Sequence, residues 1–108
     1  MSNYLLGIDC GCTVSKAAIF SVDGREIAVS GSKVEVISPQ PGHMQRDANL
    51  VWQTTAQAVR QVLAQARIDP GAIVCVACTG HGNGLYLVDQ FGQPVRHAIL
   101  STLSLIHI

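Results

Sequence analysis

The sequence predicts an α/β domain, and three observations carry this prediction. Two short apolar segments, residues 4–8 and 16–22, precede the dipeptide Asp23-Gly24, which is typical of a tight hairpin turn. A longer segment after residue 47 carries apolar residues at helical spacing. A β-branched segment without charge follows at residues 71–79. A strand meander, a helix and a further strand in this order are typical of an α/β domain.

The meander is expected to contain three antiparallel strands. A turn of small residues at positions 9–13 separates the first two, and the third occupies residues 25–37. The alternation of Ile27 with Val29, and of Val34 with Val36, supports this third strand. A proline-rich loop at residues 38–42 then interrupts regular structure.

The helix is expected to begin after Asp47 and to end near Arg67. An aspartate at this position accepts hydrogen bonds from the first backbone N–H groups of a helix, and Asp69-Pro70-Gly71 is a stop signal. Residues 71–79 then predict a buried strand, because they combine β-branched side chains with an absence of charge. A further strand is expected to begin at residues 85–88 and to run toward a turn around Gly92.

Composition excludes several classes of function. Of the 108 residues, 48% are hydrophobic and 13% are charged, which suits one small packed domain. Seven basic side chains balance seven acidic ones, so nothing points to nucleic acid or to an anionic membrane. No signal peptide is evident, and the glycine-rich residues 79–84 interrupt the one long uncharged segment. We therefore expect a soluble cytoplasmic protein.

Four cysteines raise the question of a zinc site. Cys10 and Cys12 are too closely spaced for a zinc knuckle, and Cys75 and Cys78 point to opposite faces if they lie in a strand. No feature marks an oxidising compartment, which disfavours disulfides. We expect reduced and mostly buried thiols.

The turn after the first strand has the residues of a phosphate site. Gly11 removes the side chain that would block an approaching anion, Thr13 adds a hydroxyl donor, and Lys16 adds a positive charge. Asp9 would repel phosphate unless a divalent cation or its bound water lay beside it. This combination suits phosphoryl transfer. A plain hairpin turn explains the same residues equally well on spacing alone.

A second loop, residues 79–84, follows the predicted buried strand. Loops at the carboxyl ends of sheet strands bind the ligands of α/β proteins. Here glycines flank His81 and Asn83, whose side chains both donate and accept hydrogen bonds, as recognition of a polyol requires. A flexible connection with a solvated His81 is the alternative.

Taken in order, these segments resemble the FGGY family of carbohydrate kinases. Residues 6–11 with Thr13 and Lys16 look like the opening phosphate loop of that family. Residues 38–42, Arg46-Asp47 and Trp52 are similar to its next loop and helix start, and residues 94–102 to the segment before a sugar-proximal Asp. Among its members, the L-xylulose kinases look most similar.

The resemblance implies a ribonuclease H-like domain of the actin/hexokinase-like superfamily, which uses ATP with Mg²⁺ to phosphorylate a sugar hydroxyl. Asp9 would act near the metal through a bound water. The phosphate site would be lined by Gly11, Cys12, Thr13 and Lys16, and the sugar contacted by His81, Gly82 and Asn83. Cys12 departs from the family's usual Thr or Gly, and a thiol is a weaker donor than a hydroxyl.

The resemblance also implies that the chain is incomplete. The catalytic base and the adenine pocket of the family lie beyond it, so the 108 residues alone are expected to be inactive. Residues 1–102 are expected to be the N-terminal part of the first kinase domain. Residues 103–108 match what a common sequencing adapter encodes in frame, and we expect read-through there; a genuine C-terminal strand is the alternative.

Two other functions remain open at this stage. ATP-driven activators of radical dehydratases, from the same superfamily, also open with Asp-x-Gly but use cysteines for an iron–sulfur cluster. A non-catalytic nucleotide-binding or regulatory domain is the third possibility. For the kinase, the partner is a small sugar such as L-xylulose or a related polyol, and homo-oligomerisation of the full-length protein stays open.

Overall fold

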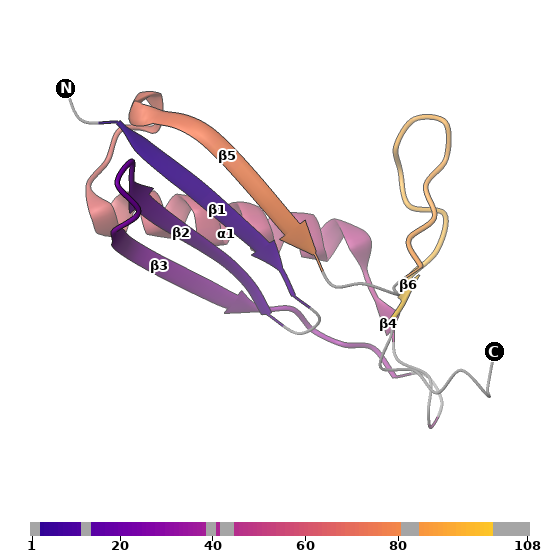
Figure 1. The fold of residues 1–108 in the computed structure, drawn as a ribbon. Helices are drawn as coiled ribbons and strands as arrows, with labels where there is room; N and C mark the ends of the chain where they lie inside the picture. Colours follow the sequence, from indigo (N-terminus) through magenta and orange to yellow (C-terminus); the bar gives the residue numbers. More distant parts are fainter. Residues whose placement is uncertain (1–2, 12–13, 39–40, 42–44, 81–84, 101–108) are drawn as a thin grey trace.

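The computed structural model describes residues 3–11, 14–38, 41, 45–80 and 85–100. Its main sheet has four strands in the order β3-β2-β1-β5, with β5 parallel to β1 and the other neighbours antiparallel (Figure 1). The four strands are β1 Tyr4–Cys10, β2 Val14–Ser21, β3 Glu26–Lys33 and β5 Ile73–Gly80. A small second sheet pairs β4 Gln45–Arg46 with β6 Ala98–Ile99, and the helices are α1 Ala48–Ala66 and the short 3₁₀ helix η1 Pro70–Ala72.

The predicted hairpin turn at Asp23-Gly24 is confirmed. Gly24 has φ 92°, which favours glycine, and its N–H donates to the Ser21 carbonyl at 2.9 Å. The Ser21 hydroxyl donates to the Asp23 carboxylate, and this hydrogen bond lowers the pKa of Asp23. The turn lies at the end of the sheet opposite to the C-terminal end of β1 (Figure 1).

The third strand is shorter than the predicted 25–37. Lys33 pairs with Val14, the first residue of β2, and the β2–β3 ladder ends there among the described residues. Ile37 instead forms an isolated bridge to Gln45, with N···O distances of 2.7 and 2.8 Å. The second pair of alternating residues, Val34 and Val36, therefore lies outside the main sheet.

Both predicted ends of the helix are confirmed. The Asp47 carboxylate accepts from the N–H groups of Asn49 and Leu50 at 2.9 and 3.4 Å, and this satisfies two free donors of the first turn. Arg67 ends α1 in the left-handed conformation with φ 55°. Two backbone hydrogen bonds complete the last turn: the Arg67 N–H donates to the Ala64 carbonyl, and the Ile68 N–H donates to the Leu63 carbonyl.

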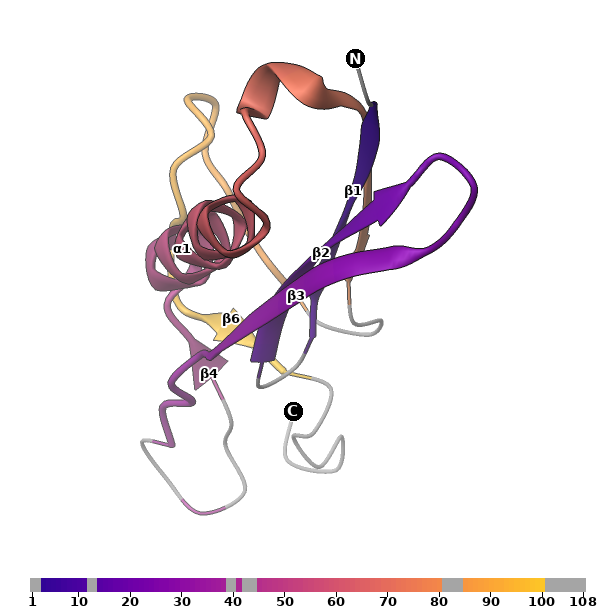
Figure 2. The ribbon, with the colours of Figure 1, turned by 90° about the vertical axis from the view of Figure 1, so that its left-hand side faces the viewer.

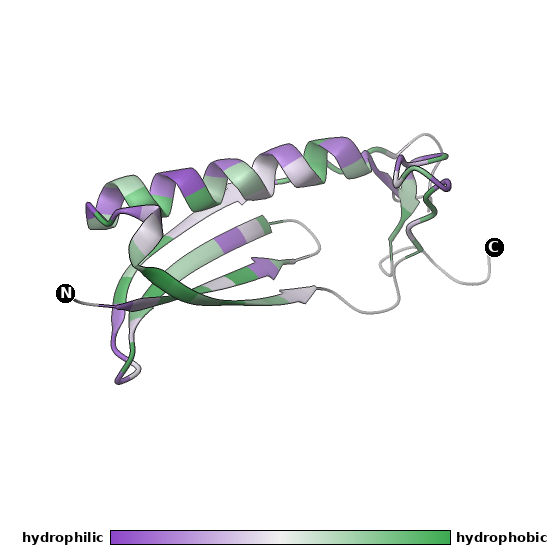
Figure 3. Cartoon of the chain, turned by 90° about the horizontal axis from the view of Figure 1, so that it is seen from above, coloured by the Kyte–Doolittle hydropathy of each residue, from purple (hydrophilic) through white to green (hydrophobic). Residues whose placement is uncertain are grey.

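The core lies between α1 and one face of the sheet. Thr54, Ala58 and Val62 form the buried stripe of the helix, and Ala58 and Val62 pack against Leu6, Ala17 and Ile19. Figures 2 and 3 show α1 along a single face of the sheet, and its contacts are mainly with β2 and β3. The helix therefore leaves β5 uncovered.

The prediction that residues 71–79 form a buried strand is therefore wrong about burial. The strand exists as β5, but Val74 and Val76 keep 56% and 53% of their surface exposed. Cys75 and Cys78 are exposed as well, so the expectation of mostly buried thiols fails for this pair. An uncharged β-branched segment indicates a strand, whereas its burial depends on what packs over it.

The segment from residue 85, where a strand was expected, forms isolated β-bridges in place of a continuous strand. Leu85 pairs with Ile99 and Val88 with Pro94, around a turn in which Gly92 has φ 78°. The Asp89 carboxylate accepts from the N–H groups of Phe91 and Gln93 at 2.8 and 3.0 Å. None of the described helices is long and apolar enough to cross a membrane.

Candidate active site

The two loops singled out in the sequence begin side by side. In the parallel ladder of β1 and β5, Asp9 pairs with Thr79 and Cys10 with Gly80. The carboxyl ends of both strands therefore meet at one edge of the sheet, where α/β proteins bind ligands. Cys12, Thr13, His81, Gly82 and Asn83 lie outside the described residues, but the residues that lead into both loops are neighbours.

On the face of the sheet away from α1, this edge carries polar side chains. Asp9 pairs with Lys16 across the antiparallel β1–β2 ladder, so both side chains share a face, and both are exposed. Thr79 occupies the position paired with Asp9 on the other side. A carboxylate, an ammonium group and a hydroxyl thus lie on three adjacent strands at the end where the loops begin.

On the helix side, the same edge encloses a small cavity. It measures about 150 Å³ and is lined by Cys10, Arg46, Val51, Gly80 and Tyr86. The Cys10 thiol lies 3.7 Å from the Thr55 hydroxyl, which in turn donates to the buried Ser15 hydroxyl at 3.0 Å. The end of β1 is therefore attached to α1 and β2 by a chain of side-chain hydrogen bonds.

Gly11 occupies a tight turn that leaves no room for a side chain. Its N–H donates to the Val14 carbonyl at 2.9 Å, and a Cβ at this position would come within 2.7 Å of the same oxygen. Its carbonyl accepts a hydrogen bond from Nη1 of Arg46 at 2.6 Å. The glycine predicted for the phosphate turn is therefore required by the local geometry.

Arg46 is the residue at this site that sequence reasoning missed. Its side chain is completely buried and reaches a residue 35 positions earlier in the chain. In the sequence Arg46 entered only as part of the family resemblance at Arg46-Asp47, and no role was assigned to it. Nothing in that resemblance indicates contact with Gly11.

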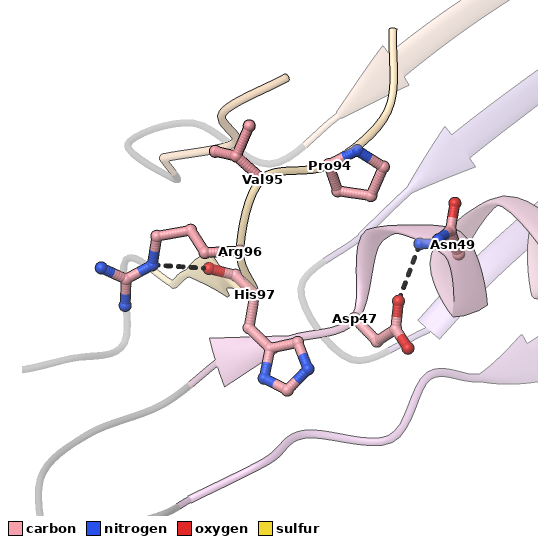
Figure 4. Close-up of a pocket in the computed structure, with 6 residues that line it drawn as sticks. All are labelled: Asp47, Asn49, Pro94, Val95, Arg96 and His97. Carbon is pink, nitrogen blue, oxygen red and sulfur yellow. Dashed lines mark hydrogen bonds between the residues drawn. The ribbon is translucent and has the colours of Figure 1, made fainter. Parts of the chain in front are cut away.

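A larger pocket lies elsewhere among the described residues and is less suited to binding. It measures about 410 Å³ and is lined by Asp47, Asn49, Pro94, Val95, Arg96 and His97 (Figure 4). The Asp47 carboxylate caps α1, and Nε of Arg96 donates to the His97 carbonyl at 3.2 Å. In Figure 4 the polar side chains point in different directions and do not converge on one point. We therefore place the candidate site at the ends of β1 and β5.

The residues at this edge fit a magnesium ion that arrives with its nucleotide. Within the described ranges, no group of three His, Cys, Asp or Glu side chains lies close enough together to hold a metal. Mg²⁺ usually keeps several waters and is held by one or two carboxylates together with substrate phosphates. The exposed Asp9 can supply one such carboxylate, directly or through water.

Comparison with known proteins identifies the family. The N-terminal domain of the FGGY family of carbohydrate kinases matches residues 4–104. The chain belongs to the FGGY family. The match includes β1, the Gly11 turn, α1 and β5, so the FGGY kinase domain contains the whole candidate site.

Relatives in the FGGY family agree in activity and differ in substrate. A probable L-xylulose kinase of Pasteurella multocida is 38% identical over 100 residues, which cover 93% of this chain and 21% of that protein. The L-xylulose/3-keto-L-gulonate kinase of Escherichia coli is 35% identical over 102 residues, or 94% of this chain and 20% of the kinase. A glycerol kinase of Paracidovorax citrulli is 36% identical over 98 residues, which cover 90% of this chain and 19% of that protein. The chain thus spans about a fifth of the length of these relatives.

Solved structures confirm the predicted fold class. A xyloylose kinase from Brucella ovis superposes with a TM-score of 0.88 at 21% identity, over 95% of this chain and 21% of that one. The structure of Plasmodium falciparum glycerol kinase with ADP superposes with a TM-score of 0.80 at 14% identity. The match covers 98% of this chain and 22% of that one. At such identities the likeness shows the fold alone, which is an incomplete α/β fold of the actin/hexokinase-like type.

Proposed function

We propose that the full-length protein transfers the γ-phosphoryl group of ATP to a hydroxyl of a ketose such as L-xylulose. The observation that carries this proposal is the meeting of β1 and β5, whose carboxyl ends lead into a tight glycine turn and a polar glycine-rich loop at one edge of the sheet. Membership of a carbohydrate kinase family supports the reaction class, and the L-xylulose kinases among the relatives support the sugar class.

In the proposed mechanism, the Gly11 turn binds the phosphate chain of ATP. Because the Gly11 N–H already donates to the Val14 carbonyl, the backbone donors for phosphate would come from the residues that follow Gly11, and Lys16 supplies a positive charge from the adjacent strand. We propose that Cys12 and Thr13 contribute further donors from the same turn. Binding and orientation by fixed donors are the main contribution a protein makes to phosphoryl transfer.

Asp9 is proposed to hold the magnesium ion of the nucleotide through a bound water. When present, Mg²⁺ neutralises charge on the phosphate oxygens. Asp9 lies directly across the ladder from Lys16, so the carboxylate and the ammonium group are neighbours on one face of the sheet. This fixed pair would orient the hydrated cation on one side of the phosphates.

His81, Gly82 and Asn83 are proposed to bind the sugar. The loop that contains them follows Gly80, which pairs with Cys10 beside the Gly11 turn. A sugar held there would lie next to the phosphate chain, as transfer between the two requires. Amide and imidazole groups provide the directional donors and acceptors that sugar hydroxyls need.

The general base and the adenine pocket are proposed to lie outside these 108 residues. The relatives are about five times as long, so most of the kinase has no counterpart in this chain. We accordingly propose that residues 1–102 are the N-terminal part of the first kinase domain and are inactive alone. Residues 103–108 are proposed to be adapter read-through, and resequencing the locus checks this: a genomic stop codon after Ile108 would contradict it.

The test of function uses the complete polypeptide encoded at the locus, with Asp9→Asn and a control, Asp23→Asn. Both substitutions remove one exposed carboxylate, but Asp23 lies in the hairpin turn at the far end of the sheet. We expect Asp9→Asn to lower kcat by roughly 100-fold or more while the sugar KM changes less than about threefold. The control should match the parent enzyme.

A substrate panel tests the choice of sugar. We expect turnover of L-xylulose or a related ketose with Mg·ATP, and little turnover of glycerol. Phosphorylation of glycerol without any ketose would contradict the proposed substrate and favour the activity named for the glycerol kinase relatives. Parent-like kcat in Asp9→Asn would remove Asp9 from the mechanism.

A further inference from the structure

Arg46 combines complete burial with a contact to the turn that the proposed function uses. Its exposed fraction is 0%, and it is the largest fully buried side chain among the described residues. Nη1 donates to the Gly11 carbonyl at 2.6 Å, a short distance typical of a charge-assisted hydrogen bond. Removing a guanidinium group from water is costly unless it gains strong interactions. A buried arginine at this place therefore needs an explanation beyond packing.

The backbone of Arg46 is held in a fixed position by two neighbouring segments. Arg46 pairs with Ala98 in the β4–β6 sheet, and the preceding Gln45 pairs with both Ile37 and Ile99. Ala98 is 1% exposed, so the residue paired with Arg46 is buried as well. From this base the side chain extends toward the end of β1 and lines the cavity between Cys10 and Gly80.

We propose that Arg46 is the positioning residue of the phosphate turn, acting through the Gly11 carbonyl. Because a peptide group is planar, a carbonyl with a fixed direction also fixes the orientation of the amide that follows it. Arg46 would thereby hold the turn in the shape that accepts phosphate before the nucleotide arrives. Its buried charge is screened less by solvent than that of Lys16 and adds positive potential at the same end of the sheet. This inference rests on the proposed function.

A purely structural role for Arg46 predicts a different outcome. If Arg46 only fastened the β4–β6 sheet to the main sheet, its loss would lower stability and disturb sugar and nucleotide binding to a similar extent. A positioning role predicts that nucleotide affinity falls while sugar affinity stays. The ratio of the two effects therefore distinguishes the roles, and stability alone does not.

The experiment compares Arg46→Met and Arg46→Lys with Arg25→Met in the complete polypeptide. Methionine keeps much of the length and removes charge and donors, whereas lysine keeps the charge and one group able to reach a carbonyl. Arg25 lies in the exposed hairpin turn at the other end of the sheet and serves as the control. The readouts are the Kd of Mg·ATP measured by calorimetry without sugar, the sugar KM, kcat and the melting temperature.

We expect Arg46→Met to raise the Kd of Mg·ATP by about 10-fold or more, with the sugar KM within about twofold of the parent. Arg46→Lys should recover most of the affinity, and Arg25→Met should match the parent. A folded Arg46→Met with parent-like Kd, or with an equal rise in the sugar KM, would overturn the inference. If Arg46→Met does not fold, an Arg46→Lys variant that folds and loses both affinities equally would overturn it too. A parent protein that does not bind Mg·ATP would overturn the proposed function itself.

Discussion

Alanine at position 11 should damage the site, whereas the same substitution at position 7 should be harmless. An added Cβ at Gly11 would come within 2.7 Å of the Val14 carbonyl oxygen, and ordinary van der Waals contact begins at 3.4 Å. That oxygen belongs to the backbone and accepts the Gly11 N–H, so relief requires the turn itself to move by several tenths of an ångström. At Gly7 the nearest atom is Cε2 of Phe20 at 3.6 Å, which is ordinary contact with a side chain.

The expected effects differ in sign between the two positions. Gly11→Ala should cost about 1–2 kcal/mol in the free energy of unfolding, because it weakens the Gly11–Val14 hydrogen bond and strains the turn. A shift of several tenths of an ångström in a phosphate-binding turn should lower kcat/KM by roughly 10-fold to 100-fold. Gly7→Ala should be neutral or stabilise by up to about 1 kcal/mol, because glycine inside a strand carries an entropic cost that alanine reduces.

Thermal melting and steady-state kinetics of the complete polypeptide check both expectations. Gly11→Ala should melt at a lower temperature and turn over slowly, and Gly7→Ala should melt at the parent temperature or above it with parent-like kinetics. A Gly11→Ala enzyme with unchanged kcat/KM would refute the reasoning about the turn. Equal damage in both variants would show that the steric difference between the two glycines has no consequence.

Three further predictions concern stability and substrate binding. Arg67→Gly should stabilise the fold by about 0.5–1 kcal/mol, because φ 55° suits glycine better than arginine; a lower melting temperature would contradict this. Val62→Ala should destabilise by about 1.5–3 kcal/mol, because the side chain is fully buried between α1 and the sheet; denaturant unfolding with a parent-like midpoint would mean that the core repacks. Asn83→Ala should lower kcat/KM for the ketose by about 1–3 kcal/mol in transition-state binding and leave the Kd of ATP unchanged. Unaltered sugar kinetics in that variant would remove Asn83 from the sugar site.

Local signals in the sequence were sufficient for the turns and the helix. Asp23-Gly24 predicted the hairpin, and Asp47 and Asp69-Pro70-Gly71 predicted the ends of α1, because each signal depends on hydrogen bonds made within a few residues. The order of strands and helix then predicted the α/β class, which the related structures confirm.

Burial was predicted less well because it depends on distant neighbours. β5 looked buried from its residues, but α1 lies over β2 and β3 and leaves Val74 and Val76 exposed. Similarly, the described third strand ends at Lys33, where its partner β2 begins at Val14. The residue types at positions 34–37 do not indicate this end of the strand.

The sequence by itself determined the residue types of the site: a glycine turn that follows Asp9, a lysine on the next strand and a polar loop after β5. Tertiary structure alone decided that the strands leading into these parts meet, because the parallel pairing of Asp9 with Thr79 joins segments 70 residues apart in the chain. It also decided the role of Arg46, whose contact with Gly11 spans 35 positions. The chemistry of each side chain follows from its residue type. The meeting of distant segments at one edge of the sheet depends on which strands pair, and it exists only in the folded chain.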